Sequence, residues 1–544
     1  MASLTKPDHS KRGLHAKHVE TDIPVVPAEA SNGHPSSDPH LPPVEADETT
    51  RLLPRQRPDP GWLSPEDPAV SPYNLWSVRA LRYLEVFFLA ITFLWWALLF
   101  VSIFVSPPKM HSRGSGFYDV SYTTLTLGNI LLALVFFAVP STPMGVLSMT
   151  VSVLLLVDVV IILAVPRLRL EEGWVGIVSV VWAAFIGLYN VISNRTVTWG
   201  KAEEEERLTG RQETRRSLRE WFAVLITTIM LSIYVAVTLL LTASLSLRAS
   251  DASLEPPGTR YFVNSGTYQV HLACVGNQTY DDHGKRKPTV LLEGGYLPVE
   301  HSFESWVYDA YANQTISRYC YWDRPGLGWS DNAPSPHSAG MSVDALSEAL
   351  AIAGEEGPWI LVSAGIGGIY SRVFSGRHPR QIAGILLIDA VHEDFLHTIG
   401  QPGPGFLLWA RGFISPLGID RLAGALFKGR LREDRVYGRS SYQGGKFIKN
   451  KLQENLVADS LTKSEIITAR NIQQRDVKLV VVSSGVHLKQ DRDWETKQEE
   501  LSRITDSLIA WDIVAKAPPE EVWRTPDGRA LLEKRLGQLY RAAA

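Results

Sequence analysis

Ser363 is the residue best suited to covalent chemistry, because it lies in the glycine-rich segment LVSAGIGG at residues 361–368. A serine hydroxyl attacks an acyl carbon efficiently when a neighbouring base, most often a histidine, takes its proton. The last histidine of the chain is His487, and none follows it. The residue types therefore indicate acyl transfer at Ser363, but they do not identify the residue that would act as the base.

Short apolar strands and helical segments alternate around Ser363. The strands are expected at residues 261–263, 268–274, 290–292, 317–322, 359–362, 385–388 and 478–482. Helices are expected between them, for example at residues 342–353 and 366–375. Such alternation predicts an α/β domain over residues 258–544, with a mostly parallel sheet and helices on both faces.

Two motifs of this domain resemble the α/β-hydrolase superfamily. Residues 321–331, YWDRPGLGWSD, are similar to the superfamily's turn after the fourth strand, and residues 291–296, LLEGGY, resemble its oxyanion loop. The resemblance implies an α/β-hydrolase fold, with residues 400–470 as a helical cap. It gives these positions structural or oxyanion-binding roles: Asp323, Arg324, Gly326, Gly328, Gly294, Gly295 and the Ile366 amide.

The same resemblance places the nucleophile elbow at residues 361–368, in one of two registers. If Gly367 and Gly368 match the superfamily's glycines, Gly365 stands at the nucleophile position and no acyl-enzyme can form. The alternative register keeps Ser363 as the nucleophile but places the bulky Leu361 where the sharp turn needs a small residue. We favour the Gly365 register.

The histidine that the superfamily carries after its last strand is also missing, so we expect a pseudo-hydrolase that has lost Ser-His-Asp catalysis. Such a domain keeps a pocket at the carboxyl edge of its sheet and serves as a binding or scaffold module, for instance for a lipid or acyl ligand. An active esterase or lipase that uses Ser363 is the alternative. No metal or cofactor is predicted.

Residues 79–248 form an expected membrane region, because runs of about 20 apolar residues match the thickness of a bilayer. Five spans are expected, at residues 86–105, 121–139, 144–165, 173–192 and 221–247. Asp158 lies inside the third span. An intramembrane acid is a candidate for ion or proton relay, so transport by the five-helix bundle is a further alternative.

The loop between the fourth and fifth spans sets the expected topology. It is rich in arginine and lysine, which favours the cytosolic side. The N-terminus is then cytosolic and the C-terminal domain luminal. Two glycosylation sequons, at Asn277 and Asn313, would be usable in that location, which predicts a glycoprotein.

Residues 1–78 are polar and proline-rich, without helix or strand periodicity, and are expected to be disordered. An acidic dileucine sorting signal, which clathrin adaptors bind in the cytosol, has the spacing found at Glu48, Leu52 and Leu53. A chance match of this short pattern is an equally good explanation. The signal favours the vacuole or another endomembrane, with a mitochondrial or plasma membrane as the alternative.

Charge and cysteine content limit the partners and metal sites that the chain is expected to have. The net charge of −3 gives no reason to expect a nucleic-acid partner. Two cysteines exclude a cysteine-built zinc cluster. In an α/β-hydrolase sheet the strands of Cys274 and Cys320 are neighbours, so a disulfide is possible, and two buried free thiols are the alternative.

Overall fold

The computed structural model describes residues 62, 70–210 and 217–543. From Trp62 onward the chain forms one compact unit. The sorting signal at Glu48, Leu52 and Leu53 lies outside the described residues, as does most of the tail predicted at residues 1–78.

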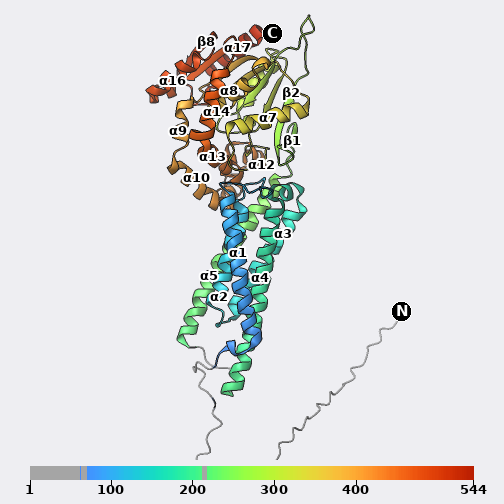
Figure 1. Cartoon of the computed structure of the whole chain (residues 1–544), viewed down its shortest axis with the longest axis vertical. Helices are drawn as coiled ribbons and strands as arrows, with labels where there is room; N and C mark the ends of the chain where they lie inside the picture. The colour runs from blue at the N-terminus through green and yellow to red at the C-terminus, as the bar shows by residue number, and fades with distance from the viewer. Residues whose placement is uncertain (1–61, 63–69, 211–216, 544) are drawn as a thin grey trace, which may run out of the picture. The chain divides into compact units, whose positions relative to one another are not determined.

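The membrane region contains five helices (Figure 1). They are α1 (Trp76–Ser102), α2 (Phe117–Val135), α3 (Thr142–Ala164), α4 (Pro166–Thr209) and α5 (Leu218–Asp251). Ser141 caps α3, because its hydroxyl accepts a hydrogen bond from the Met144 amide, and Pro166 separates α3 from α4. Within α4, Gly173 interrupts the helix with φ 63°, a backbone conformation that suits glycine.

Four of these helices, α1, α3, α4 and α5, are long and apolar enough to cross a membrane. Four of the five predicted spans therefore correspond to helices that could cross a membrane. The remaining helix, α2, occupies the place of the predicted second span. It carries polar residues such as Asp119 and Asn129, which are buried between its neighbours. Its polar side chains lower its mean hydropathy, while packing against α1 and α4 covers them.

The C-terminal part is built on an eight-stranded sheet with the order β1-β2-β4-β3-β5-β6-β7-β8. The strands are β1 (Thr259–Val263), β2 (Tyr268–Val275), β3 (Thr289–Glu293), β4 (Tyr319–Trp322), β5 (Trp359–Ala364), β6 (Ile382–Ile388), β7 (Lys478–Ser484) and β8 (Ser507–Val514). Strand β2 pairs antiparallel with β1 and β4, and the pairs from β4 to β8 are parallel. This order is that of the α/β-hydrolase fold, so the predicted fold class is confirmed for this domain.

Helices cover both faces of the sheet (Figure 1). One face packs against α7 (Ala339–Ala353), α8 (Gly367–Arg377), α14 (Lys463–Ile472) and α16 (Arg492–Ser502). The other packs against α6 (Phe303–Ala312) and α17 (Pro526–Ala543). Successive residues of the central strands alternate between the two covered faces, which is why both β3 and β5 are buried throughout and mostly apolar.

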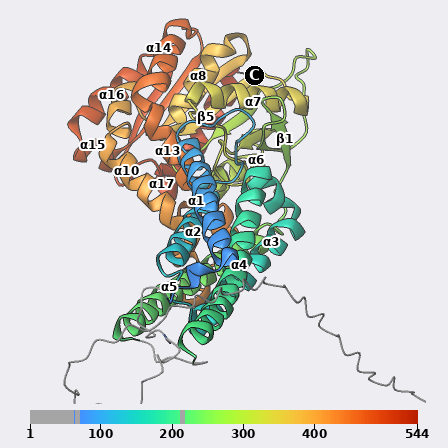
Figure 2. The ribbon, with the colours of Figure 1, turned by 60° about the horizontal axis from the view of Figure 1, so that its bottom comes forward.

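A helical cap is inserted between β6 and β7, in the interval where the sequence predicts it. Its helices before α14 are α9 (Leu396–Ile399), α10 (Pro402–Ile414), α11 (Ile419–Phe427), α12 (Arg432–Val436) and α13 (Gly445–Val457). After β7 comes the short α15 (Gly485–Gln490). Leu99 and Phe117 of the membrane region share one apolar cluster with Ile448 and Leu452 of α13, and Figure 2 shows α10 and α13 beside the end of α1. The cap therefore joins the sheet domain to the membrane helices.

Candidate functional site

The turn between β5 and α8 has the geometry of a nucleophile elbow. Strand β5 ends at Ala364, α8 begins at Gly367, and Gly365 between them has φ 51°. A nucleophile in this fold stands on such a sharp strand-to-helix turn, in a strained conformation that glycine adopts at little cost. The structure thus places Gly365, and not Ser363, on the turn. Ser363 lies two residues earlier, inside β5, with its side chain fully buried and its hydroxyl without a hydrogen-bond partner among the described residues.

Glu520 fills the space in front of Gly365. A Cβ atom on Gly365 would lie 2.6 Å from Oε2 of Glu520. Glu520 follows β8, in the loop where the superfamily carries its histidine, and its backbone N–H donates to Oδ2 of Asp389 at 2.8 Å. Burial raises the pKa of Glu520, and the nearby Asp389 raises it further. The sequence analysis missed this residue, although its position after the last strand was a usable signal.

Asp389 organises this end of the sheet. It follows β6 with φ 44°, is fully buried, and receives hydrogen bonds from the Ser484 amide and from Trp494 Nε1. Its Oδ2 lies 2.8 Å from Nδ1 of His487, whose ring stacks on Trp494 with centroids 3.9 Å apart. The structure therefore pairs an aspartate with a histidine, but on the α15 side of the site and next to Glu520 rather than next to a serine.

The predicted oxyanion loop is held from behind by Arg324. Its guanidinium donates to Oε1 of Glu293 at 2.6 Å, and also to the carbonyl oxygens of Gly294 and Gly295 at 2.5 and 2.6 Å. It also lies over the ring of Tyr370, 4.5 Å from the centroid. Burial raises the pKa of Glu293 to about 7, against the opposing effect of Arg324. This buried pair fixes the backbone that faces Gly365.

Asp323 and the glycines of the same motif shape the turn after β4. Asp323 accepts the Trp329 amide at 3.0 Å, and its Oδ2 lies 3.0 Å from Nδ1 of His271. Gly326 and Gly328 both have positive φ, and a Cβ atom on Gly328 would lie 2.4 Å from Asp323. These residues are structural, as the resemblance implies. Ile366 directly follows Gly365 and precedes α8, so its backbone belongs to the turn itself.

One buried set of residues has metal-ligand chemistry. His271, Glu300 and Asp323 bring their ligand atoms within 4.8 Å of one another. Burial raises the pKa of Glu300 well above its usual range, and the neighbouring Asp323 raises it further. A protonated Glu300 beside an ionised Asp323 accounts for this arrangement without a cation.

A cavity of about 270 Å³ opens beside the elbow. Its lining includes Gly295 and Glu520 from the site, the aromatic rings of Tyr296 and Trp523, and the basic Arg439. Its walls combine these rings with charged and polar side chains such as Arg524 and Glu521, and pockets that combine apolar surface with fixed polar groups bind small molecules. The arrangement therefore offers a ligand space at the carboxyl edge of the sheet, with a carboxylate in place of a nucleophile.

The other predicted site residues lie apart from the elbow. Cys274 and Cys320 face each other in the antiparallel register of β2 and β4 and form a disulfide. Asn277 and Asn313 are exposed, and the Asn313 amide donates to Glu533 at 2.7 Å. Asp158 is buried inside α3 and accepts a hydrogen bond from the Tyr122 hydroxyl of α2 at 3.0 Å.

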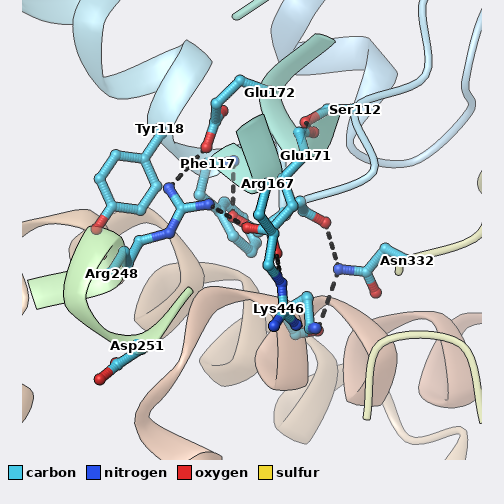
Figure 3. Close-up of polar contacts among 12 residues, drawn as sticks. Ser112, Phe117, Tyr118, Arg167, Glu171, Glu172, Arg248, Asp251, Asn332 and Lys446 are labelled. Carbon is cyan, nitrogen blue, oxygen red and sulfur yellow. Dashed lines mark hydrogen bonds and ion pairs between the residues drawn. The ribbon is translucent and has the colours of Figure 1, made fainter. Parts of the chain in front are cut away.

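A second polar cluster lies where the membrane helices meet the cap (Figure 3). Arg248, near the end of α5, donates to Glu172 at 2.6 Å and to Glu171 at 2.9 Å. Both glutamates precede the interruption of α4. Asn332, from the sheet domain, bonds the carbonyl oxygens of Gly114 and Lys446. The neutral Asn332 thus joins the sheet domain to the membrane region and to the cap at this boundary, beside the ion pairs of Arg248.

Solved structures of α/β-hydrolases resemble the C-terminal part only distantly. Alpha/beta hydrolase domain-containing protein 10 from mouse is 13% identical, with a TM-score of 0.34, over 53% of this chain and 100% of that chain. A thermophilic esterase from Thermogutta terrifontis is 14% identical, with a TM-score of 0.36, over 52% of this chain and 100% of its own.

Among the sequence relatives, one covers most of the chain. Residues 48–274 match the family model described as Region of unknown function (DUF2417). A protein of Saccharomyces cerevisiae named as an uncharacterized vacuolar membrane protein is 27% identical over 50% of this chain and 49% of its own length. An uncharacterized protein of Schizosaccharomyces pombe is 34% identical over 528 residues, which are 91% of this chain and 97% of that protein. With an α/β-hydrolase fold behind a set of membrane helices, the chain belongs to the family of this Schizosaccharomyces pombe protein.

Proposed function

We propose that the chain is an integral protein of the vacuolar membrane, or of another endomembrane, whose luminal α/β-hydrolase-like domain binds a ligand without Ser-His-Asp hydrolysis. The observation that carries this proposal is the pair formed by Gly365 and Glu520. The elbow has no side chain to attack a substrate, and a carboxylate with a raised pKa occupies the space that a nucleophile and its base would share.

The position of Ser363 supports the same proposal over an active hydrolase. Its hydroxyl is fully buried within β5, and the described residues provide it with no hydrogen-bonded base. A serine without a base keeps its high pKa and is a weak nucleophile. The cavity beside Tyr296 and Trp523 is the proposed ligand space, and its aromatic walls suit a lipid or acyl group.

The proposed location rests on several agreeing features. The basic loop between α4 and α5 favours a cytosolic side for that loop, which leaves the sheet domain in the lumen. A disulfide and exposed sequons are compatible with an oxidising, glycosylating compartment. The vacuolar name of the Saccharomyces cerevisiae relative agrees with the dileucine-like signal, through which we propose recognition by a clathrin adaptor.

A fluorophosphonate probe tests the loss of catalysis, because it labels only activated serine nucleophiles. We expect no covalent labelling of the purified full-length protein, and the same result for the Ser363→Ala variant. A known serine hydrolase in the same detergent serves as the positive control. Labelling of the wild type that disappears in Ser363→Ala would replace this proposal with an active hydrolase.

A further inference from the structure

A cavity of about 100 Å³ lies at the boundary between the membrane helices and the cap, apart from the elbow. Its walls come from the ends of α4 and α5, from the loop before α2, and from the cap around α11 to α13. Figure 3 shows part of these walls, with Arg167, Arg248 and Lys446 drawn near one another. Neither the hydrolase-like site nor the family comparison assigns a role to this cavity.

Positive charge predominates in the walls. Five cationic side chains line the cavity, namely Arg167, Arg248, Arg421, Arg435 and Lys446. Only two acidic side chains line it, Glu171 and Asp251.

Ion pairs offset only part of this charge. Arg248 divides its guanidinium between Glu171 and Glu172, of which Glu172 lies behind the wall. Arg421 and Arg435 share the single carboxylate of Asp251, at 2.7 and 2.5 Å. Even when Glu172 is included, the cations outnumber the acids, so an anion placed here would be attracted.

The N-terminus of α13 faces the same cavity. Gly444 is its N-cap and has no side chain to satisfy the first amides of the helix, and Gly445, Lys446 and Phe447 of the first turn also line the cavity. The first N–H groups of a helix lack partners within it and carry partial positive charge, which suits them to bind an anion. Lys446 adds an ammonium group, which donates a hydrogen bond to the Gly328 carbonyl at 3.0 Å.

Ser441 provides an independent indication of a missing ligand. Its side chain lines the cavity and is 6% exposed, yet its hydroxyl has no hydrogen-bond partner among the described residues. A buried hydroxyl without a hydrogen-bond partner is unfavourable, because its hydrogen bonds to water are lost and not replaced. A tetrahedral oxyanion at the helix N-terminus has enough acceptor oxygens for the hydroxyl, the first-turn amides and the Lys446 ammonium together.

We propose that this cavity binds a phosphate group, which either the headgroup of an anionic phospholipid or free inorganic phosphate would supply. The position of the cavity favours the lipid source. Arg421, which lines it, lies on α11, and the same short helix exposes Ile419, Leu426 and Phe427. This helix packs against the end of α5, one of the helices long and apolar enough to span the membrane. An apolar face beside a membrane helix suits contact with lipid.

Two variants isolate the proposed contacts. Lys446→Gln removes the ammonium group, and Ser441→Ala removes only a hydroxyl and no charge, so it is the milder change if Lys446→Gln folds poorly. Lys446→Arg keeps the charge and serves as the conservative rescue. Lys489→Gln, an exposed lysine of α15 outside this cavity, is the matched control.

The test measures the melting temperature of the full-length protein with two probes at constant ionic strength. The first probe is inorganic phosphate in detergent, and the second is a phosphatidylcholine nanodisc with or without phosphatidic acid. We expect a rise of roughly 2 °C or more for the wild type, Lys446→Arg and Lys489→Gln, since a bound ligand stabilises the folded state. Lys446→Gln should lose the rise, and Ser441→Ala should need more probe to reach it.

The two probes distinguish the sources. A rise with phosphatidic acid alone identifies a lipid headgroup, a rise with inorganic phosphate alone identifies the free ion, and a rise with both shows recognition of the phosphate group itself. The proposal is overturned if neither probe raises the melting temperature of the wild type. It is also overturned if Lys446→Gln and Ser441→Ala both respond as the wild type does.

Discussion

The carboxylate of Glu520 occupies the space in which a side chain on Gly365 would stand, 2.6 Å from the place of its Cβ atom. Two departures from the hydrolase pattern thus fit each other: the elbow has lost its side chain, and the loop after β8 carries a larger, acidic one. The Glu520 amide donates to Asp389, which fixes the backbone of the loop, so a side chain on Gly365 could be accommodated only if the Glu520 side chain rotated away. Restoring one position alone should therefore be unfavourable.

Gly365→Ala is expected to destabilise the protein by about 2 kcal/mol. The left-handed backbone of Gly365 accounts for about 1 kcal/mol of this, and displacement of the flexible Glu520 carboxylate for about 1 kcal/mol, the lower end of the usual cost of overpacking. When Glu520 is also replaced by alanine, the part of the destabilisation that comes from contact with Glu520 should disappear. The measurement is a double-mutant cycle on the melting temperature of the full chain.

Gly354→Ala is the matched control for this cycle. Gly354 also has positive φ, 73°, but nothing lies within 4 Å of a Cβ atom built there. Gly354→Ala therefore measures only the loss of stability caused by placing alanine in a left-handed backbone conformation. Equal losses for Gly354→Ala and Gly365→Ala, with no coupling to Glu520, would show that the carboxylate does not fill the nucleophile's place.

The strand pattern and the two hydrolase motifs were enough to predict the fold of residues 258–544, because strand order follows from such motifs. The position of Glu520 after the last strand was a usable signal, but its contact with Gly365 could not be predicted, since it depends on how the loop after β8 folds back onto β5. The polar residues of α2 explain why only four of the five predicted spans match helices long and apolar enough to cross a membrane: Asn129 lies within the predicted run 121–139, and the helix also begins before the run and includes Asp119. The boundary cavity was missed because it joins residues far apart in sequence.

Asn277→Gln and Asn313→Gln are each expected to remove one glycan if the sheet domain is luminal. Both side chains are exposed, so an oligosaccharide could be attached without disturbing the core. The measurement is gel mobility with and without glycosidase. Asn194→Gln, a sequon inside α4, should change nothing. If glycosidase leaves the mobility of the wild type unchanged, and protease reaches the C-terminus from the cytosol, the luminal placement is wrong.

His337 should make the protein less stable in acid. Burial lowers the pKa of its imidazole to about 3, and the nearby His111 acts in the same direction. As pH falls below about 6.5, the unfolded chain binds a proton at this position while the folded chain does not, so the unfolding free energy decreases. The expected loss between pH 6.5 and pH 4.5 is roughly 2 kcal/mol from this group.

His337→Gln, which cannot titrate, should flatten the dependence of the melting temperature on pH over this range. His283→Gln is the control, because His283 is exposed and should leave the wild-type slope in place. A variant at His337 whose slope equals that of the wild type would mean that this imidazole is protonated in the folded protein.

Arg324→Met is expected to destabilise the sheet domain by about 3–5 kcal/mol, the usual effect of breaking one side of a buried ion pair. The change removes the Arg324 donor from the carbonyl oxygens of Gly294 and Gly295 and from Glu293, which keeps its hydrogen bond from Trp322 Nε1. Arg324→Met combined with Glu293→Met removes both charges and should recover part of the stability. The measurement is again the melting temperature of the full chain. A double variant no more stable than Arg324→Met would show that the two carbonyl contacts, rather than the ion pair, hold the loop in front of Gly365.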